Sequence, residues 1–271
     1  LGRREQSRLF ARLARYQHRR EGNHGLASAN IALKEAQHGR FLLKIILDLS
    51  DGAFLRTRHL EGQILTTVTN RDALAKLPVL RKSDLMDAQQ AKPPFGEFAV
   101  AANLAGTRVF VSPGPVWEPQ GLGADPWSGA RALFAAGFRS GDMVHNALSY
   151  HATPGGFILD EALRALGCTV FPAGVGGTEQ QVQAAAHLQA SAYTGTPDYL
   201  KVMLDKADEM GADLASIKRA MVSGGALFPS MRDEYRERGV NVMQSYATAD
   251  LGVIAYETYG SDGLCDGMIV N

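Results

Sequence analysis

Four short segments of the chain combine glycines with hydroxyl-bearing or other small residues, and such segments could bind an anionic ligand. They are residues 174–177 (Gly-Val-Gly-Gly), 194–196 (Thr-Gly-Thr), 223–225 (Ser-Gly-Gly) and 245–248 (Ser-Tyr-Ala-Thr). Small residues let the backbone approach a ligand closely, while hydroxyls and free amides bind phosphate or carboxylate oxygens. One such segment alone is explained more simply as a tight turn. Four together favour a site for a nucleotide or another anionic substrate.

The elements that would position these segments follow from alternating extended and helical patterns after residue 125. Apolar runs predict strands at residues 142–148, 168–171, 192–194, 221–222 and 240–244, and helical spacing predicts helices at 128–136, 156–166, 178–188, 197–210 and 229–238. Gly137, Gly167 and Gly211 would end three helices, Pro197 would begin one, and Thr178 with Gln181 has capping-box spacing. This alternation predicts an α/β fold, a mostly parallel sheet with helices on both faces, which binds ligands beyond the carboxyl ends of its strands.

The first part of the chain is predicted to be a separate helical segment, residues 1–76, ahead of an α/β region at residues 77–271. Leu9, Leu13 and Tyr16 lie at helical spacing in a stretch rich in Arg, His and Gln. A basic helix could contact nucleic acid or another partner, but aromatic stacking groups are not interleaved with these basic residues. A solvated helix face is therefore the favoured interpretation.

A connector is predicted where the α/β region begins. The proline in residues 77–85 indicates an extended segment, followed by a helix for which Ser83 is a suitable N-cap. A short β-like run at residues 108–111 then leads into residues 112–123, whose prolines and glycines predict an irregular loop.

Composition argues against several classes of protein. The chain has 271 residues with 28 basic and 28 acidic side chains, so no global field favours nucleic acid or an anionic membrane as a partner. Its two cysteines are too few for a disulfide framework and suit a reducing, cytoplasmic compartment. No apolar run reaches the roughly 20 residues that span a bilayer. A zinc site built from His145, His151, Cys168 and Cys265 stays open, although their spacing matches no common ligand pattern.

Several longer motifs follow one another in a characteristic order. They are residues 77–85 (Leu-Pro-Val-Leu-Arg-Lys-Ser-Asp-Leu), 135–142 (Ala-Ala-Gly-Phe-Arg-Ser-Gly-Asp), 171–179 (Phe-Pro-Ala-Gly-Val-Gly-Gly-Thr-Glu), 194–197 (Thr-Gly-Thr-Pro), 222–227 (Val-Ser-Gly-Gly-Ala-Leu) and 244–250 (Gln-Ser-Tyr-Ala-Thr-Ala-Asp). In this order they resemble the phenylacetate-CoA ligases of the adenylate-forming family, over about residues 70–271. The resemblance implies the family's large N-terminal domain. It also implies that a carboxylic acid, of aromatic type, reacts with ATP and Mg²⁺ to form an acyl-adenylate and is then transferred to coenzyme A, in a homodimer.

The resemblance further implies roles for individual residues. Thr248 and Asp250 would be catalytic, with Thr248 at the α-phosphate and Asp250 also at the metal, where the family's usual glutamate is longer. Nucleotide binding would involve Ser112, Gly114, Ser223, Gly224, Gly225, Ala226, Ser245, Tyr246, Ala247 and Thr248, with Tyr246 near adenine. Acid binding would involve Tyr150, His151, Gly155, Gly195 and Thr196. Taken alone, Asp250 is explained more simply as a helix cap or turn carboxylate, and Tyr150 and His151 as a core-edge and a loop residue.

Two departures from the family pattern leave a second hypothesis open. The family's phosphate loop is rich in Ser, Thr and Gly and ends in Lys-Pro, whereas residues 112–119 are Ser-Pro-Gly-Pro-Val-Trp-Glu-Pro. The prolines offer no amide hydrogen, and Glu118 places a negative charge where a cation helps to hold polyphosphate. The sequence also stops at Asn271, before the family's C-terminal lid domain. The alternative is therefore a ligand-binding paralogue that does not activate acids, or an incomplete fragment of a ligase.

Overall fold

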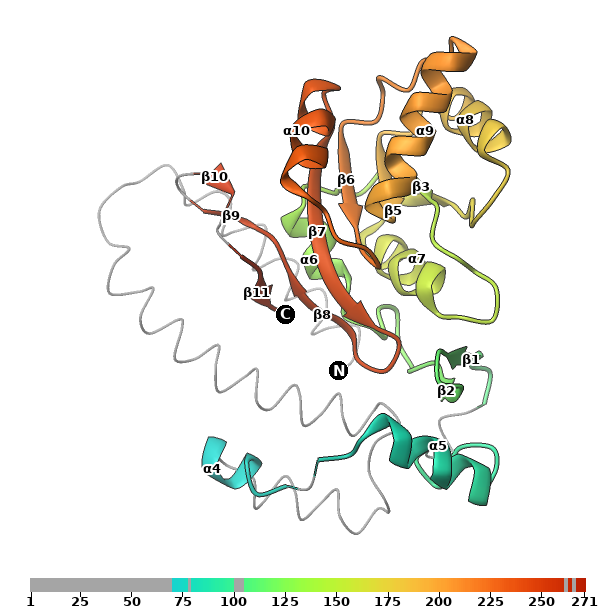
Figure 1. The fold of residues 1–271 in the computed structure, drawn as a ribbon, viewed down its shortest axis with the longest axis vertical. Helices are drawn as coiled ribbons and strands as arrows, with labels where there is room; N and C mark the ends of the chain where they lie inside the picture. Colours follow the sequence, from blue (N-terminus) through green and yellow to red (C-terminus); the bar gives the residue numbers. More distant parts are fainter. Residues whose placement is uncertain (1–69, 78, 100–104, 261–262, 265–266) are drawn as a thin grey trace, which may run out of the picture. The chain divides into compact units, whose positions relative to one another are not determined.

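The computed structural model describes residues 70–77, 79–99, 105–260, 263–264 and 267–271, all within one compact unit of the chain (Figure 1). The helical segment predicted at residues 1–76 falls almost wholly outside these ranges, as does Cys265 of the zinc hypothesis. Within the described ranges, every helix is too short or too polar to traverse a bilayer.

A seven-stranded sheet organises the described residues, with strand order β11-β8-β7-β6-β5-β3-β4. Its parallel strands are β3 (Met143–Asn146), β4 (Thr169–Phe171), β5 (Ala192–Gly195), β6 (Arg219–Val222) and β7 (Asn241–Thr248). Two further strands, β8 (Gly252–Tyr256) and β11 (Ile269–Val270), extend it in antiparallel fashion. The predicted α/β fold with a mostly parallel sheet is confirmed. The two antiparallel strands were not predicted.

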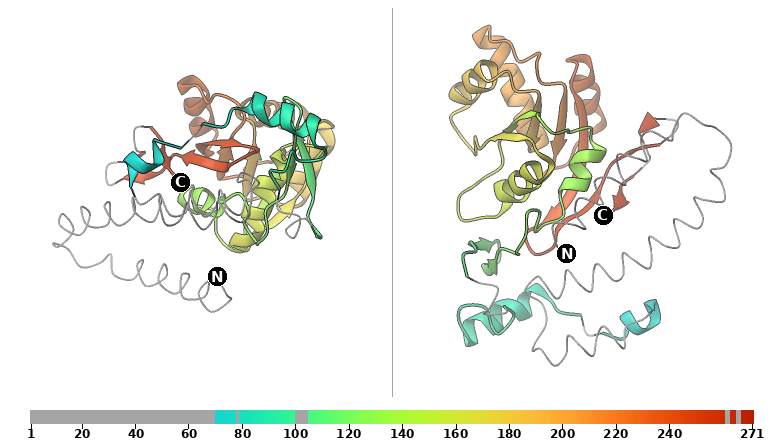
Figure 2. Two further views of the ribbon diagram at one scale, coloured as in Figure 1. Left: turned by 90° about the horizontal axis from the view of Figure 1, so that it is seen from below. Right: turned by 180° about the vertical axis from the view of Figure 1, so that it is seen from behind.

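Helices cover both faces of the sheet, and each face has its own apolar core (Figure 2). α6 (Ala130–Ala135) and α7 (Gly155–Leu166) pack on one face, and α8 (Thr178–His187), α9 (Pro197–Met210) and α10 (Pro229–Glu237) pack on the other. Successive strand residues point to opposite faces. Met221 therefore belongs to the first core, under α6 and α7, while its neighbours Ala220 and Val222 belong to the second core, under α8, α9 and α10. Strands buried on both faces explain the continuous apolar runs in the sequence.

Glycine and proline mark the helix ends as predicted. Gly167 and Gly211 follow α7 and α9 with left-handed φ values of 91° and 63°, a conformation that glycine adopts without steric cost. Pro197 opens α9, where the absence of its amide hydrogen costs no intrahelical bond. These local rules fix where both helices begin or end.

Two predicted helix caps are wrong. Helix α5 (Lys82–Ala91) begins before Ser83, with Arg81 as the N-cap residue, and the Asp84 carboxylate accepts the Arg81 amide at 3.2 Å. Helix α8 begins after Gly177 rather than at a capping box of Thr178 and Gln181. The Gln181 side chain is engaged elsewhere, because its amide donates to two carbonyl oxygens of the preceding loop.

The loop predicted at residues 112–123 is partly a β-hairpin. Strands β1 (Val109–Ser112) and β2 (Val116–Pro119) pair antiparallel, and the proline- and glycine-rich residues 113–115 form the turn between them. The hairpin is tied to the sheet domain because the Val111 amide donates to the Ala152 carbonyl at 2.9 Å. A short helix, α4 (Arg71–Leu74), precedes α5, and β9 (Tyr259–Gly260) pairs with β10 (Gly263–Leu264) near the end of the chain.

Candidate functional site

Buried polar side chains lie where the parallel strands end. On the face that α6 and α7 cover, Val144, Ala192 and Met243 belong to the apolar core, and the residue two positions further along each strand is polar. These polar residues are Asn146, Thr194 and Ser245, joined by Ser223 just after β6, and all four are buried. We call these four residues the polar layer. Within the described part of the chain, the hydroxyls of Thr194 and Ser245 have no hydrogen-bond partner.

Segments from different strands meet around the polar layer. The backbone amide of Ser223 donates to the Gly195 carbonyl at 3.0 Å, and its hydroxyl donates to the Ser245 carbonyl at 2.9 Å. On the other side of β5, the Gly174 amide donates to the Asn146 carbonyl at 3.1 Å. The glycine- and hydroxyl-rich segments that follow β4, β5 and β6 therefore share one rim with β7.

A shelf of small residues lies beside an exposed aromatic ring on this rim. Gly224, Gly225 and Ala226 are exposed, and the Gln244 side-chain amide holds the Gly225 carbonyl at 2.9 Å. Tyr246 lies two residues beyond Gln244, so both side chains share a face of β7. The Tyr246 side chain is 56% exposed. An exposed ring on the strand face to which Gln244 ties this shelf can stack on another planar ring.

Gly195 is packed against the ring of Tyr193 from its own strand. A Cβ atom added at Gly195 would lie 2.0 Å from the Tyr193 hydroxyl oxygen and 2.3 Å from the ring carbon that bears it. That hydroxyl donates to the Thr196 carbonyl at 3.2 Å, and the ring is fully buried. Packing against Tyr193 therefore requires glycine at position 195. The next residue, Thr196, is half-buried, so solvent reaches it.

The predicted acid-binding residues lie beside the polar layer, but they differ in how they are engaged. The Tyr150 hydroxyl donates to Asp160 at 2.8 Å and accepts from Asn146 at 2.7 Å. Burial, reinforced by the Asp160 charge, raises the pKa of Tyr150, so its hydroxyl stays protonated. His151 is exposed, and its backbone amide donates to the Ser149 hydroxyl at 3.3 Å. Gly155 is the first residue of α7.

The β1–β2 hairpin brings Ser112 into a charged cluster with a residue of α5. The Lys82 ammonium donates to the Ser112 hydroxyl at 3.0 Å and lies 3.7 Å from an Asp250 carboxylate oxygen. Gly114 lies in the hairpin turn with φ 141°, a backbone conformation that favours glycine, and its Cα faces the Lys82 side chain, which an added Cβ would contact at 3.4 Å. The sequence did not predict Lys82 as a site residue, because it lies 30 residues from Ser112 and much further along the chain from Asp250.

Glu118 completes the cluster, which we call the Glu118 cluster: Lys82, Ser112, Glu118 and Asp250. The Ser112 hydroxyl donates to Glu118 at 2.5 Å, and the Lys82 ammonium lies 4.0 Å from the same carboxylate oxygen. Burial raises the pKa of Glu118 to about 7, and the neighbouring Asp250 adds to this rise. Within the described residues no N–H or O–H donor reaches the second, buried Glu118 oxygen, and the carboxyl group lies within hydrogen-bonding reach of the Asp250 carboxylate.

The remaining predicted residues lie along the far half of β7 and the turn that follows. Ala247 packs against the first core, and the Thr248 hydroxyl accepts the Leu251 amide at 3.2 Å. Asp250 lies in the turn between β7 and β8, not at a helix start. Because a strand rises ~3.3 Å per residue, about 10 Å of β7 separates Ser245 from Thr248. β7 and the turn after it therefore connect the two parts of the site: Gln244 contacts the shelf, and Asp250 belongs to the Glu118 cluster.

Comparison with known proteins places this arrangement in a family. The phenylacetate-coenzyme A ligase of Aromatoleum evansii is 33% identical over 188 residues, 66% of this chain and 42% of the relative. That of Pseudomonas putida is 31% identical over 194 residues, 68% of this chain and 43% of the relative. No family model matches the chain. The chain spans about two fifths of the length of these curated relatives.

Solved structures agree with this assignment. The crystal structure of an open conformation of 2-hydroxyisobutyryl-CoA ligase, in complex with 2-HIB-AMP and CoA, has a TM-score of 0.62 at 25% identity, over 72% of this chain and 45% of that one. The thioesterification state of the same enzyme has a TM-score of 0.68 at 23% identity, over 87% of this chain and 54% of that one, which supports the fold. This chain is a phenylacetate-CoA ligase-like member of the adenylate-forming enzymes.

The donor set of this phenylacetate-CoA ligase-like chain suits a magnesium ion carried by a nucleotide better than a resident ion. No group of three or more His, Cys, Asp or Glu side chains in the described residues could hold a metal. Asp250 and Glu118 supply two neighbouring carboxyl groups. Mg²⁺ in nucleotide sites is commonly held by one or two carboxylates together with phosphate oxygens and water. Asp250 therefore fits the predicted metal role only with phosphate present.

A buried hydrogen-bond chain fixes the loop after β4 in this phenylacetate-CoA ligase-like chain. The Gln181 amide donates to the carbonyls of Gly174 at 3.1 Å and Gly176 at 2.7 Å, so its oxygen is left to accept from His145 Nε2 at 2.8 Å. His145 is therefore the Nε2–H tautomer, and burial lowers its pKa. The sequence placed Gln181 in a helix cap and did not predict this role.

The zinc hypothesis gains no support from the described residues. His145 is committed to Gln181, and Cys168 is buried with its thiol donating to the Arg139 carbonyl at 3.3 Å. Burial raises the pKa of Cys168 to about 11, which disfavours the thiolate that zinc requires.

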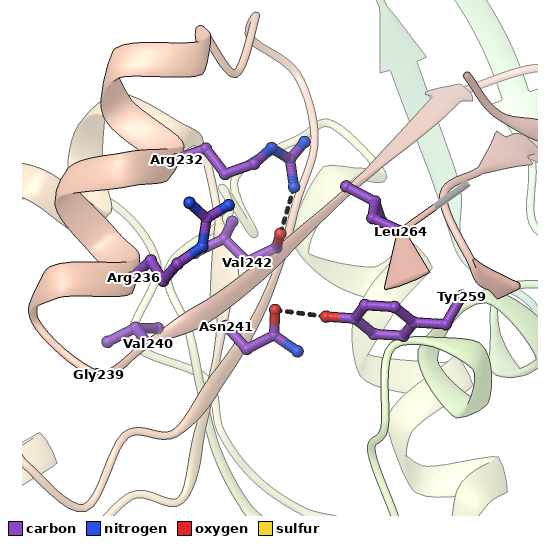
Figure 3. Close-up of a pocket in the computed structure, with 8 residues that line it drawn as sticks. All are labelled: Arg232, Arg236, Gly239, Val240, Asn241, Val242, Tyr259 and Leu264. Carbon is purple, nitrogen blue, oxygen red and sulfur yellow. Dashed lines mark hydrogen bonds between the residues drawn. The ribbon is translucent and has the colours of Figure 1, made fainter. Parts of the chain in front are cut away.

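A separate pocket of about 400 Å³ opens at the other end of β7 (Figure 3). It is lined by Arg232, Arg236, Gly239, Val240, Asn241, Val242, Tyr259 and Leu264. Arg232 is already paired with Glu257 at 2.7 Å, and the Tyr259 hydroxyl donates to Asn241 at 2.6 Å. Because Asn241 begins β7, this pocket lies at the opposite end of the strand from the rim that carries the polar layer.

Proposed function

We propose that this chain is the nucleotide- and acid-binding part of an AMP-forming acid–CoA ligase. In the proposed reaction, a carboxylate oxygen attacks the α-phosphorus of ATP, which gives an acyl-adenylate and releases pyrophosphate. The thiol of coenzyme A then attacks the acyl carbon and releases AMP. The observation that carries the proposal is that β7 presents Tyr246 beside the small-residue shelf and leads, a few residues later, into the Glu118 cluster.

The adenine of the nucleotide would lie on the shelf. Gly224, Gly225 and Ala226 are exposed and lack large side chains, and Tyr246 offers an exposed ring on the adjoining face of β7. A purine placed there would stack on the ring while its edge met backbone amides and carbonyls. Ser223 and Ser245 would support this arrangement from below, because the hydrogen bond from the Ser223 hydroxyl joins the shelf to β7.

The phosphates would lie beyond Tyr246, toward the β7–β8 turn. Thr248 would contact the α-phosphate, and Asp250 would face the magnesium ion, which would neutralise phosphate charge as the bond to pyrophosphate breaks. Ser112 and the turn at Gly114 would meet the outer phosphates. Lys82 would supply the cation that the hairpin itself lacks, since its ammonium already reaches Ser112 and Asp250.

The acid would lie between the rim and the start of α7. Tyr150 and Gly155 border this region, Gly195 and Thr196 form the neighbouring strand end, and His151 is the exposed member of the set. The Tyr150 ring packs edge-on against Phe157 with ring centroids 5.0 Å apart. An apolar, aromatic wall of this kind suits an aryl acid, and the named relatives are phenylacetate ligases.

Two assays test the proposal in sequence. Isothermal titration calorimetry of the full chain with Mg²⁺ and AMP or ATP should show binding that Tyr246→Ala weakens. Pyrophosphate release with a panel of aryl acids, in the presence of coenzyme A, then tests acid activation. Light scattering would test the homodimer expected from the family. Absence of nucleotide binding in the folded chain would disprove the proposed site.

A second candidate function is ligand binding without acid activation. It is favoured by one observation, the engagement of Ser112 and Lys82 by Glu118 where a phosphate would otherwise bind. In this case an aryl acid or acyl-CoA would bind tightly without pyrophosphate release. Formation of an acyl-adenylate by the wild-type protein would eliminate this candidate.

A further inference from the structure

Glu118 places a carboxyl group where the proposed nucleotide would place its outer phosphates, and this group is anionic above the pKa of about 7 to which burial raises it. Its carboxyl group accepts the Ser112 hydroxyl at 2.5 Å and lies 4.0 Å from the Lys82 ammonium. These are the hydroxyl donor and the cation that this region offers to a phosphate oxygen. A β- or γ-phosphate would have to displace Glu118 from both groups or share them with it.

The charge balance of the Glu118 cluster also opposes a polyphosphate. Two carboxyl groups, Glu118 and Asp250, face the single ammonium of Lys82. The side chains of Glu118 and Asp250 are only 13% and 21% exposed, so water screens them weakly from a ligand that enters. One magnesium ion can offset part of this charge, but it leaves Glu118 in contact with Ser112.

The groups proposed for adenosine and the α-phosphate are independent of Glu118. The shelf is held by the bond from Gln244 to Gly225, and the Thr248 hydroxyl is engaged only with the Leu251 amide among the contacts described. A ligand with one phosphate can therefore use Tyr246 and Thr248 without reaching Ser112. A ligand with three phosphates must extend into the Glu118 cluster.

We infer that Glu118 is a specificity-determining residue that makes this site bind an adenylate, either AMP or an acyl-adenylate, in preference to ATP. The inference rests on the proposed adenine-nucleotide site and deepens it. Under the proposed ligase function, the consequence is that the adenylate intermediate is held more tightly than the nucleotide from which it forms.

The test is calorimetric titration of the full chain with AMP, ADP and ATP, each with excess Mg²⁺, at about pH 8.5, where the Glu118 carboxyl group is ionised. The wild-type protein should bind AMP at least about tenfold more tightly than Mg·ATP, with ADP between them. Glu118→Gln retains the side-chain shape but removes the negative charge. It should raise the affinity for Mg·ATP at least about fivefold and leave the affinity for AMP within about twofold.

Glu161→Gln is the matched control, because Glu161 on α7 is a similarly covered glutamate, 15% exposed, that is paired with Arg108 and lies outside the proposed site. It should leave the AMP-to-ATP ratio unchanged. Equal wild-type affinities for AMP and Mg·ATP, or a Glu118→Gln ratio equal to wild type, would overturn the inference while leaving the nucleotide site intact. Failure of the folded wild type to bind any of the three nucleotides would overturn both. If Glu118→Gln does not fold, the wild-type series alone decides.

Discussion

Substitution of Gly195 by alanine tests the packing at the centre of the rim. The new methyl group would lie 2.0 Å from the Tyr193 hydroxyl oxygen and 2.3 Å from the adjoining ring carbon, far inside van der Waals contact. The Tyr193 ring cannot move aside freely, because it is fully buried and its hydroxyl is bonded to the Thr196 carbonyl. Either the ring or the end of β5 must shift.

The expected loss of stability combines two costs. Overpacking of a buried site costs about 1–3 kcal/mol, and loss of the Tyr193 hydrogen bond to Thr196 costs about 0.5–1.5 kcal/mol more. Gly195→Ala should therefore lower the free energy of unfolding by roughly 2–4 kcal/mol. For a unit of this size, that corresponds to a fall in Tm of roughly 5–15 °C.

Urea denaturation followed by circular dichroism measures this loss, and Gly155→Ala is the control. At Gly155 the nearest atom to an added Cβ is 3.7 Å away, and the residue begins a helix, so alanine should be neutral or slightly stabilising there. Adding Tyr193→Phe to Gly195→Ala should recover part of the loss, because it removes the nearest clashing atom. A Gly195→Ala protein within about 0.5 kcal/mol of wild type would refute this account of the packing.

Three further predictions concern the first residue of β8, the buried histidine and the lysine of the Glu118 cluster. Gly252→Ala should lower the unfolding free energy by more than about 3 kcal/mol in urea titrations, because its Cβ would meet the Trp127 backbone at 2.3 Å at a φ of 75°. Burial lowers the pKa of His145 below 6.5 in the folded state. The stability contributed by the neutral imidazole is therefore present above pH 6.5 and is lost as the pH falls below 6.5, by up to about 1.4 kcal/mol per pH unit. His145→Gln should reduce this slope in unfolding curves between about pH 5 and pH 7.5, and equal slopes would contradict it. Lys82→Met should weaken Mg·ATP binding about tenfold by calorimetry, and unchanged affinity would remove Lys82 from the proposed phosphate site.

The fold was largely predictable because its rules are local. Alternating apolar strands and amphipathic helices indicated the parallel sheet, and Gly167, Gly211 and Pro197 marked helix ends through backbone geometry alone. The β1–β2 hairpin was missed because the prolines of residues 113–115 dominated the interpretation. The apolar residues on both sides of that turn, Phe110 and Val116, were the available indication of paired strands.

Site residues were predictable only where they belong to a sequence motif. Ser223, Ser245 and Gly195 were predicted to share a rim, and direct hydrogen bonds join Ser223 to both of the others. The partners of Glu118 could not be inferred, because Lys82 reaches it from another element and its charge was expected to repel a ligand rather than to bind Ser112. Such contacts depend on tertiary structure, which sequence spacing does not encode.

The polar layer has a practical consequence for directed evolution of ligand preference. Asn146, Thr194, Ser223 and Ser245 separate the apolar interior from the exposed positions above it. Libraries that vary Ala226, Tyr246 or Thr196 would therefore sample new binding chemistry while the interior that supports folding stays constant. Libraries that reach below the layer, to Met221 or Met243, would mix altered recognition with loss of folded protein.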